Sequence, residues 1–247
     1  MAKKLYEEEN IYNIACALRT KCGDNTATYK TCDMAEAITN LPSGDTDIED
    51  SLISGWSNPL TEYTNDRVTN LRSFAFAQCS QLTSISLPNL NGGIAQYCFY
   101  NCKALTTVDL PKAALIDIRG FENCSNLTDI SLPAVTSVGQ NAFYGCSALK
   151  TADFLTLSSL INQYAFYNCS VLTALILRSE TMPTLYDYQT FYNTPIASGT
   201  GYIYVPAALV DTYKADGNWS TYAAQFRALE NYTVDGTTTG ALDPTKI

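Results

Sequence analysis

The residues with the clearest potential for chemistry are cysteines, because the chain has nine of them and no histidine. Five recur every 22 or 23 residues, at Cys79, Cys102, Cys124, Cys146 and Cys169. Thiols stacked about 5 Å apart, the spacing of a strand ladder, could form disulfides or bind a metal ion. Stacked side chains point the same way, however, and the chain has no CxxC pair to begin a zinc site. The spacing therefore favours buried cysteines that fill space as small apolar side chains.

The other four cysteines follow no ligand pattern. Cys16, Cys22 and Cys32 lie near the N-terminus, and we interpret them as packing residues, with a Cys22–Cys32 disulfide as the minor alternative. Cys98 directly precedes a repeated phenylalanine, where the other repeats have alanine or glycine. Cys98 is therefore expected to replace a small residue in a tight turn.

Catalytic chemistry has little support in the rest of the sequence. Without histidine the chain lacks the commonest general base and metal ligand. It has no phosphate-binding loop, GxSxG, HExxH or EF-hand sequence. A carbohydrate-active enzyme would need two carboxylates a fixed distance apart, and only stacking of repeats brings aspartates together. Asp109 and Asp153 would lie about 10 Å apart, too far for one calcium ion. We predict no catalytic residue, metal site or cofactor.

One sequence unit recurs five times, and this repeat is what must position any functional residue. Each unit has a phenylalanine, a cysteine three residues later and a leucine three residues after that. The phenylalanines are Phe76, Phe99, Phe121, Phe143 and Phe166, and the leucines are Leu82, Leu105, Leu127, Leu149 and Leu172. An upstream apolar column contains Leu71, Ile94, Ile116, Val138 and Ile161. Columns in register predict continuous spines of like side chains inside a repeat protein.

Each unit continues from its leucine as a short alternation of polar and apolar residues, as in TSISL at 83–87. This alternation predicts a strand with one buried face. Proline follows the strand at Pro88, Pro111 and Pro133, where it ends the ladder. One strand and one turn per coil is typical of a solenoid, whose coils bury their apolar side only by stacking. We predict a mostly β solenoid of short parallel strands, one per coil of 22 or 23 residues.

The outward strand positions form two columns of small, polar, slightly acidic residues. We expect both columns to face solvent: Ser84, Thr107, Asp129, Thr151 and Ala174, then Ser86, Asp109, Ser131, Asp153 and Ile176. They form either a plainly solvated face or part of a binding surface that includes Asp109, Asp129 and Asp153.

Tyrosine is more suggestive, because seventeen tyrosines include a column directly after the repeated phenylalanine. That column contains Tyr100, Tyr144, Tyr167 and Tyr192, and Tyr97 and Tyr164 lie two residues before their phenylalanines. Exposed tyrosines offer an apolar ring and a hydroxyl, which suit sugars and protein partners. The alternative is that these rings only cover the turns. We select the six tyrosines as the candidate partner-binding surface, with the three aspartates.

The two ends of the chain differ from the repeats. Residues 1–44 have apolar residues at helical spacing and are predicted to form a helical docking or assembly module. Residues 45–67 are predicted to be a linker and the N-terminal cap of the solenoid, which occupies residues 68–206 and includes a degenerate sixth repeat. Residues 207–247 are predicted to form a C-terminal cap, beginning with a helix after Pro206 and closed by Trp219, Tyr222, Phe226 and Leu229, followed by an extended tail.

The motif AFYNCSxLTxxxLP resembles the BspA-like leucine-rich repeats, and IYVPAALVDTYKADGNWSTYAAQF is similar to the segment that closes such arrays. This resemblance covers residues 60–229. The segment NIACALRTKCGDNTATYKTCDMAEAITNL is similar to a short module that precedes repeats in proteins of Firmicutes and their prophages, although Thr31 replaces its usual proline. The resemblance implies a leucine-rich-repeat fold and a role in adhesion or recognition, as a bacterial surface protein or as part of a phage particle.

The net charge and the N-terminal sequence indicate where the protein is expected to act. A net charge of −9 opposes binding to nucleic acid or anionic lipid, and the sequence shows neither a membrane span nor a secretory signal. We therefore expect a phage virion component made in the host cytoplasm, with a bacterial surface or secreted adhesin as the alternative. The expected partners are other virion proteins through residues 1–44 and a host surface protein or glycan through the solenoid, with a homo-oligomer possible.

Overall fold

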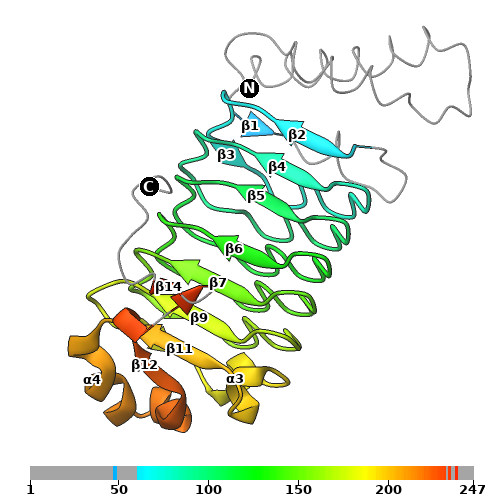
Figure 1. The fold of residues 1–247 in the computed structure, drawn as a ribbon. Helices are drawn as coiled ribbons and strands as arrows, with labels where there is room; N and C mark the ends of the chain where they lie inside the picture. The colour runs from blue at the N-terminus through cyan, green and yellow to red at the C-terminus, as the bar shows by residue number, and fades with distance from the viewer. Residues whose placement is uncertain (1–46, 49–59, 232, 235–236, 239–247) are drawn as a thin grey trace, which may run out of the picture.

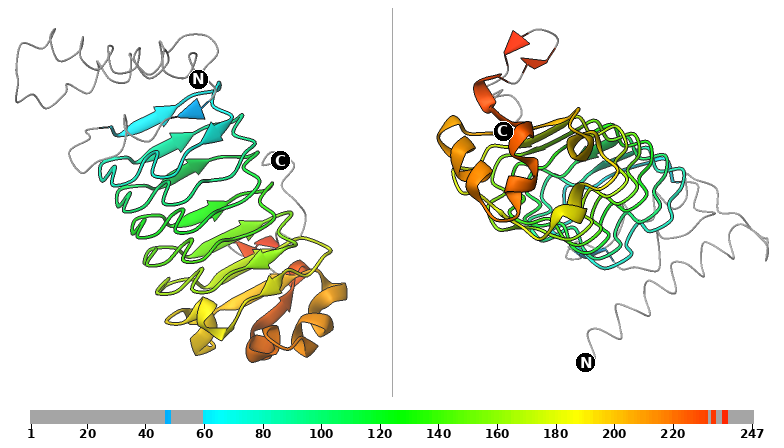
Figure 2. Two further views of the ribbon diagram at one scale, coloured as in Figure 1. Left: turned by 180° about the vertical axis from the view of Figure 1, so that it is seen from behind. Right: turned by 90° about the horizontal axis from the view of Figure 1, so that it is seen from below.

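This computed structural model describes residues 47–48, 60–231, 233–234 and 237–238. The predicted helical module of residues 1–44, with Cys16, Cys22 and Cys32, lies outside the described residues, as does most of the predicted tail. The described chain winds into successive coils that stack along one axis (Figure 1). Seen from below, the coils overlie one another around a shared interior (Figure 2). The predicted solenoid is confirmed.

Each coil contributes one short strand to a parallel face. The strands are β2 (Glu62–Thr64), β4 (Ser84–Ser86), β5 (Thr107–Asp109), β6 (Asp129–Ser131), β7 (Thr151–Phe154), β9 (Ala174–Leu177), β11 (Tyr202–Val205) and β12 (Phe226–Ala228). They form two parallel sheets, β2-β4-β5 and β6-β7-β9-β11-β12. Like positions pair, for example Ile85 with Val108 and Ala152 with Leu175. The division between β5 and β6 was not predicted.

The opposite side of each coil carries a second, sparser ladder. It contains β1 (Asp47–Ile48), β3 (Asn70–Leu71), β8 (Leu160–Ile161) and β10 (Thr184–Leu185), which pair in parallel as β1-β3 and β8-β10. Single parallel bridges between these pairs join Ile94 to Ile116, Ile116 to Val138 and Val138 to Ile161. This is the upstream apolar column, so the sequence repeat places two ladders on opposite sides of one core.

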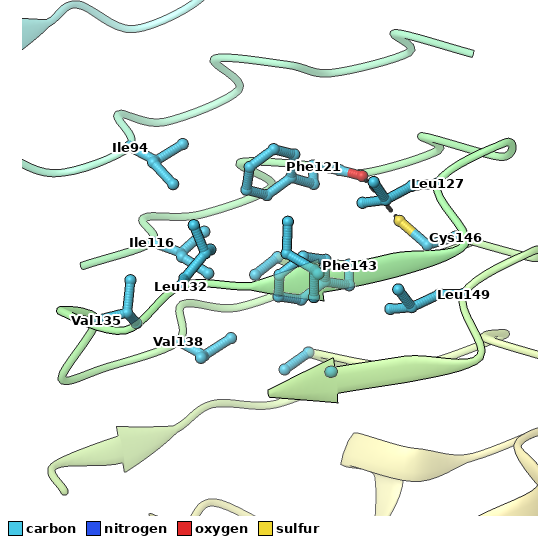
Figure 3. Close-up of a cluster of buried hydrophobic side chains, with 14 of the residues drawn as sticks. Ile94, Ile116, Phe121, Leu127, Leu132, Val135, Val138, Phe143, Cys146 and Leu149 are labelled. Carbon is cyan, nitrogen blue, oxygen red and sulfur yellow. Dashed lines mark hydrogen bonds between the residues drawn. The ribbon is translucent and has the colours of Figure 1, made fainter. Parts of the chain in front are cut away.

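The core consists of the predicted columns. All fifteen phenylalanine, cysteine and leucine positions of the spine are fully buried. The rings of Phe76, Phe99, Phe121, Phe143, Phe166 and Phe191 stack in sequence, with centroids 5.0–5.6 Å apart and interplanar angles of 3–15°. Figure 3 shows part of this interior, with Leu127 and Leu149 beside the ring column. Val108 differs from the other inward strand residues, because it is only partly buried. It lies in β5, the strand beside the division between the two sheets.

The residue before each phenylalanine is small because the turn leaves no room. A Cβ added at Gly120 would lie 2.7 Å from Ile116 Cγ2. Ala75, Ala142, Ala165 and Cys98 occupy the equivalent position and are fully buried. Cys98 therefore takes the place of a small residue, as predicted.

The C-terminal cap combines short helices with one further strand. It contains η1 (Tyr188–Phe191), α3 (Pro195–Ser198), η2 (Ala207–Leu209), α4 (Val210–Ala215), η3 (Trp219–Gln225) and η4 (Leu229–Asn231). Tyr213, Trp219 and Phe226 form a buried aromatic cluster. Phe226 lies in β12, which extends the main sheet, so the cap contains one strand besides the helix predicted after Pro206. Strands β13 (Thr233–Val234) and β14 (Thr237–Thr238) pair antiparallel beyond it.

Candidate binding surfaces

In each of the five repeats the turn holds two residues in the left-handed conformation, one on each side of the buried phenylalanine. The residues two before it are Phe74, Tyr97, Arg119, Asn141 and Tyr164, with φ of 57–64°. The residues two after it include Asn101, Asn123, Gly145, Asn168 and Asn193, with φ of 58–71°. Asparagine and glycine tolerate this backbone well, whereas larger side chains rarely adopt it. The first position therefore carries backbone strain in most coils, whereas the second does so only at Gln78 among the described coils.

The second left-handed position forms a partial amide ladder between coils. Asn123 Nδ2 donates to Asn101 Oδ1 at 3.1 Å, and Asn193 Nδ2 donates to Asn168 Oδ1 at 2.8 Å. Gly145 interrupts the ladder, and a Cβ there would lie within van der Waals overlap of Asn123 Oδ1. These bonds hold the turns in a fixed relation, which makes the edge a rigid platform.

Four of the six candidate tyrosines form one group on this edge, the C-terminal tyrosine cluster of Tyr144, Tyr164, Tyr167 and Tyr192. The rings of Tyr144 and Tyr167 stack at 5.1 Å, and those of Tyr167 and Tyr192 also at 5.1 Å. Tyr164 meets Tyr167 at 80°, with centroids 5.4 Å apart. Partial desolvation raises the pKa of Tyr167, and the neighbouring phenols raise it further, so the Tyr167 hydroxyl stays protonated near pH 7.

The other two candidate tyrosines belong to a separate N-terminal aromatic cluster of Phe74, Tyr97 and Tyr100. Phe74 stacks on Tyr97 at 4.8 Å, and Tyr97 meets Tyr100 edge-on at 5.6 Å. The Arg119 guanidinium lies 5.4 Å from the Tyr97 ring centroid, a cation–π distance. Phe74 is 44% exposed. Phe74 had not been selected from the sequence, although its place two residues before Phe76 matches that of Tyr97.

An ion pair separates the two clusters. Glu122 occupies the column that holds tyrosine in most neighbouring coils, and its Oε2 lies 3.3 Å from Arg119 Nε. Burial raises the pKa of the Glu122 carboxyl, and Arg119 opposes that shift. The candidate tyrosines are therefore two surfaces with different chemistry, which spacing alone did not reveal.

The three candidate aspartates lie on the outer sheet face in different settings. Asp109 is exposed and accepts a hydrogen bond from Ser86 Oγ at 2.6 Å, and Asp129 is exposed as well. Asp153 is partly buried and bound by Arg178, whose Nε and Nη2 each donate to it at 2.8 Å. Asp153 is thereby neutralised, so of the three aspartates only Asp109 and Asp129 add net negative charge to this face.

Two residues expected to face solvent on this sheet are buried. Ala174 is 7% exposed and Ile176 is 1% exposed. In register they pair with Tyr202 and Tyr204 of the next strand, whose large side chains point outward on the same face. Alternation correctly placed Ala174 and Ile176 on the outer side of the strand, but their burial comes from the following coil.

Tyr202 and Tyr204, with Arg227, form an outer patch that the sequence reasoning missed. The Arg227 guanidinium lies 4.3 Å from the Tyr202 ring centroid, and its Nη1 donates to the carbonyls of Ala224 and Phe226 at 2.8 Å. Desolvation raises the pKa of Tyr204, whereas Arg227 lowers it. The alternation in YIYV at 202–205 was the available signal, since it places both tyrosines on the polar side of a strand.

The repeated cysteines are internal hydrogen-bond donors. The Sγ of Cys102, Cys124, Cys146 and Cys169 donates to a phenylalanine carbonyl of the preceding coil at 3.0–3.2 Å, as the dashed line from Cys146 to Phe121 shows (Figure 3). Burial raises the pKa of the Cys146 thiol to about 12, against the effect of a backbone hydrogen bond. Within the described residues none of the six cysteines forms a disulfide, and no group of three or more His, Cys, Asp or Glu side chains could hold a metal ion.

The degenerate sixth coil changes the use of the cysteine position. Thr194 replaces cysteine there, and its Oγ1 donates to Phe191 O at 2.7 Å. The same oxygen accepts from Ala197 N at 3.1 Å and so caps α3. The sixth coil therefore has a short helix before its strand β11, where the earlier coils have a turn. None of the described helices is long and apolar enough to cross a membrane.

Comparison with known proteins identifies the repeat. The model of the BspA type leucine rich repeat region matches six copies over residues 25–116 and 92–201. Similar solved structures include a leucine rich cell surface protein from Faecalibacterium prausnitzii A2-165, 23% identical, with a TM-score of 0.44, over 59% of this chain and 47% of that one. A leucine rich repeat protein of T. pallidum is 18% identical, with a TM-score of 0.40, over 61% of this chain and 77% of that one.

The present chain thus spans about half the length of the Faecalibacterium protein. The comparison with curated proteins found no match. The family model covers most of the chain, and its repeats coincide with the coils described above. The chain belongs to the BspA type leucine-rich-repeat family.

Proposed function

We propose that this protein is a non-enzymatic recognition protein whose rigid solenoid presents the candidate tyrosines to a partner on a cell surface. The observation that carries the proposal is the C-terminal tyrosine cluster, in which three rings stack at 5.1 Å intervals and the turns of Tyr167 and Tyr192 are joined by the Asn193–Asn168 amide bond. Rings that are already ordered lose little rotamer entropy when they bind, so a fixed tyrosine surface suits recognition.

The finer proposal is that the chain is a bacteriophage virion component, such as a fibre, receptor-binding or decoration protein. Residues 1–44, with their resemblance to a prophage module, would then attach it to other virion proteins. The six buried cysteines of the described residues form no disulfide, which is consistent with folding in a reducing compartment, where phage particles assemble. The alternative is a BspA-like adhesin on the bacterial surface, and the cell surface assignment of the Faecalibacterium protein belongs to that protein alone.

Mass spectrometry separates these two placements. Particles released from the producing strain are purified, and peptides of this chain are sought both in them and in washed cell envelopes. Stoichiometric recovery in particles supports the virion assignment. Recovery in envelopes together with absence from particles contradicts it and favours the adhesin.

A cell-binding measurement tests the tyrosine surface. Labelled protein is added to host bacteria and bound label is read by flow cytometry, for wild type and for the triple variant Tyr100→Ser, Tyr144→Ser and Tyr167→Ser. We expect the triple variant to lose at least tenfold in affinity, about 1.4 kcal/mol, while its far-UV circular dichroism is unchanged.

The double variant Asp109→Asn and Asp129→Asn is the matched control, because it removes the charges of two exposed aspartates on the sheet face without changing the shape of their side chains. It should bind like wild type. Loss of binding in this control with retention in the tyrosine variant would move the binding surface to the sheet face. Absence of binding by wild type would contradict recognition of the host surface.

A further inference from the structure

We propose that the C-terminal tyrosine cluster binds a neutral glycan, that is, a sugar chain without phosphate, sulfate or carboxylate groups. The inference rests on the proposed function, since it names the ligand class of the same edge. It follows from backbone strain, ring geometry, an oriented amide network and the charge of the surface.

Tyr164 carries backbone strain, as do Phe74, Tyr97 and Arg119 at the same position of other coils. Its φ is 58°, whereas Asn141, at the same position one coil earlier, has the same φ with a residue type that tolerates it. A tyrosine in the left-handed region raises the backbone energy, because its Cβ lies close to the following carbonyl oxygen. Tyr164 is also only partly buried, so apolar burial offsets little of this strain. Strain at an accessible aromatic residue is typical of binding sites.

Ring geometry determines what the cluster can offer a ligand. Both faces of Tyr167 are covered, because Tyr144 and Tyr192 stack on it at 5.1 Å. Tyr167 therefore meets Tyr164 with its ring edge, and the Tyr164 ring stands at 80° to the stack. The stack presents edges and hydroxyls, while Tyr164 and the half-exposed Tyr192 add ring surface. Ring surface beside rows of hydroxyls matches the apolar faces and hydroxyl edges of a sugar.

An oriented amide network lies beside Tyr164. Gln163 Nε2 donates to Asp187 Oδ2 at 3.2 Å and to Gln189 Oε1 at 3.1 Å. Asp187 is itself fixed, because its Oδ1 accepts from Gln189 N at 2.9 Å. Gln189 occupies in the next coil the position that Tyr164 occupies in its own, two residues before the phenylalanine. Among the described residues, Gln163 Oε1 and Gln189 Nε2 make no hydrogen bond, which leaves one acceptor and one donor held in place. Such a pair suits neighbouring hydroxyls of one sugar.

Charge favours a neutral ligand over an anionic one. The chain has a net charge of −9, and the only charged member of this network is the Asp187 carboxylate. A phosphate or a carboxylate on the ligand would be repelled here without a cation to pair with it. This argument excludes anionic glycans from the cluster.

Residue types favour a glycan over a protein partner. Protein interfaces are enriched in arginine and in large apolar anchors. The N-terminal aromatic cluster has both, in Arg119 and the 44% exposed Phe74. The C-terminal tyrosine cluster and the network beside it have phenols, amides and the Asp187 carboxylate, and neither arginine nor phenylalanine. Both clusters lie on the same turns of the solenoid, so the N-terminal aromatic cluster serves as an internal control.

The test begins with full-length protein on an array of neutral and anionic glycans that includes cellohexaose, chitohexaose and mannohexaose. Calorimetry then measures the best neutral ligand against wild type, Tyr164→Asn and the matched control Tyr97→Asn. Both substitutions place asparagine at a left-handed position, as Asn141 does naturally. We expect Tyr164→Asn to weaken binding at least tenfold without lowering the melting temperature, and Tyr97→Asn to bind like wild type.

Four results would overturn the inference: no binding to any neutral glycan, stronger binding to anionic ones, unchanged affinity in Tyr164→Asn, or equal loss in both variants. A lower melting temperature in Tyr164→Asn would show that Tyr164 serves packing, and would overturn the strain argument. If the chain binds host cells through the tyrosines but binds no neutral glycan, the proposed function stands and the ligand is a protein.

Discussion

At the scale of single residues, the repeated cysteine combines two properties that few side chains share. It is small enough for a fully buried turn, and its thiol donates to a carbonyl of the preceding coil. The sequence predicted the burial, because a residue repeated in register meets the same environment in each coil. It did not predict the hydrogen bond, because the acceptor lies 25 or 26 residues earlier in the chain.

Tyr213 provides a residue-scale prediction about stability. Its ring is fully buried, and its hydroxyl has no hydrogen-bond partner among the described residues. Burial raises the pKa of this phenol above its ordinary value. Since an unsatisfied buried hydroxyl is destabilising, Tyr213→Phe should increase the free energy of unfolding by about 1 kcal/mol in urea titration.

Tyr222→Phe is the control for this prediction. Tyr222 is equally part of the cap, but its hydroxyl donates to Tyr188 O at 2.6 Å. Its loss should decrease the free energy of unfolding by about 0.5–1.5 kcal/mol. Equal effects in the two variants would show that the Tyr213 hydroxyl is satisfied after all.

At the scale of elements, the solenoid depends on spines that cross every coil. Leu127 lies in the middle of the leucine column and is fully buried. Leu127→Ala should decrease the free energy of unfolding by about 2–5 kcal/mol, since a central cavity cannot collapse without moving both neighbouring coils. Chemical denaturation followed by circular dichroism measures this.

The matched control is Leu115→Ala, because Leu115 is 39% exposed on the same stretch of solenoid. Its effect should stay within about 0.5 kcal/mol. A loss at Leu127 no larger than the loss at Leu115 would contradict the continuous spine.

The outer side of the elements was less predictable than the inner side. Alternation assigned Ala174 and Ile176 to the outer face, and that assignment is correct. Their exposure was predicted wrongly, because Tyr202 and Tyr204 cover that part of the sheet. Exposure of an outer residue depends on the side chains of the next coil. Those outer side chains vary from coil to coil, whereas the residues of the inner columns repeat.

At the scale of the whole molecule, the buried thiols should make the free energy of unfolding decrease at alkaline pH. Burial raises the pKa of Cys102, Cys124, Cys146 and Cys169, with Cys146 at about 12, against about 8.5 in an unfolded chain. Above pH 8.5 the unfolded chain releases thiol protons that the folded chain retains. Stability should therefore be full below pH 8.5 and decrease as pH rises toward 12, by up to about 1.4 kcal/mol per pH unit for each thiol.

Urea titrations at pH 8, 9 and 10 in the presence of a reductant check this dependence. Cys146→Ala should show a shallower decrease, because one titrating thiol is removed. A free energy of unfolding that is unchanged between pH 8 and pH 10 would mean that the thiols also remain protonated in the unfolded chain or are not buried.

The sequence alone determined the period, the strand in each coil and the identity of the buried columns. It could do so because each inner position repeats every 22 or 23 residues and must satisfy the same packing each time. Only the tertiary structure decided how the outer residues group: two aromatic clusters divided by Arg119 and Glu122, an aspartate neutralised by Arg178, and a patch around Tyr202. Those groupings join side chains of different coils, where the repeat is not kept, so contact between coils rather than spacing along the chain sets them.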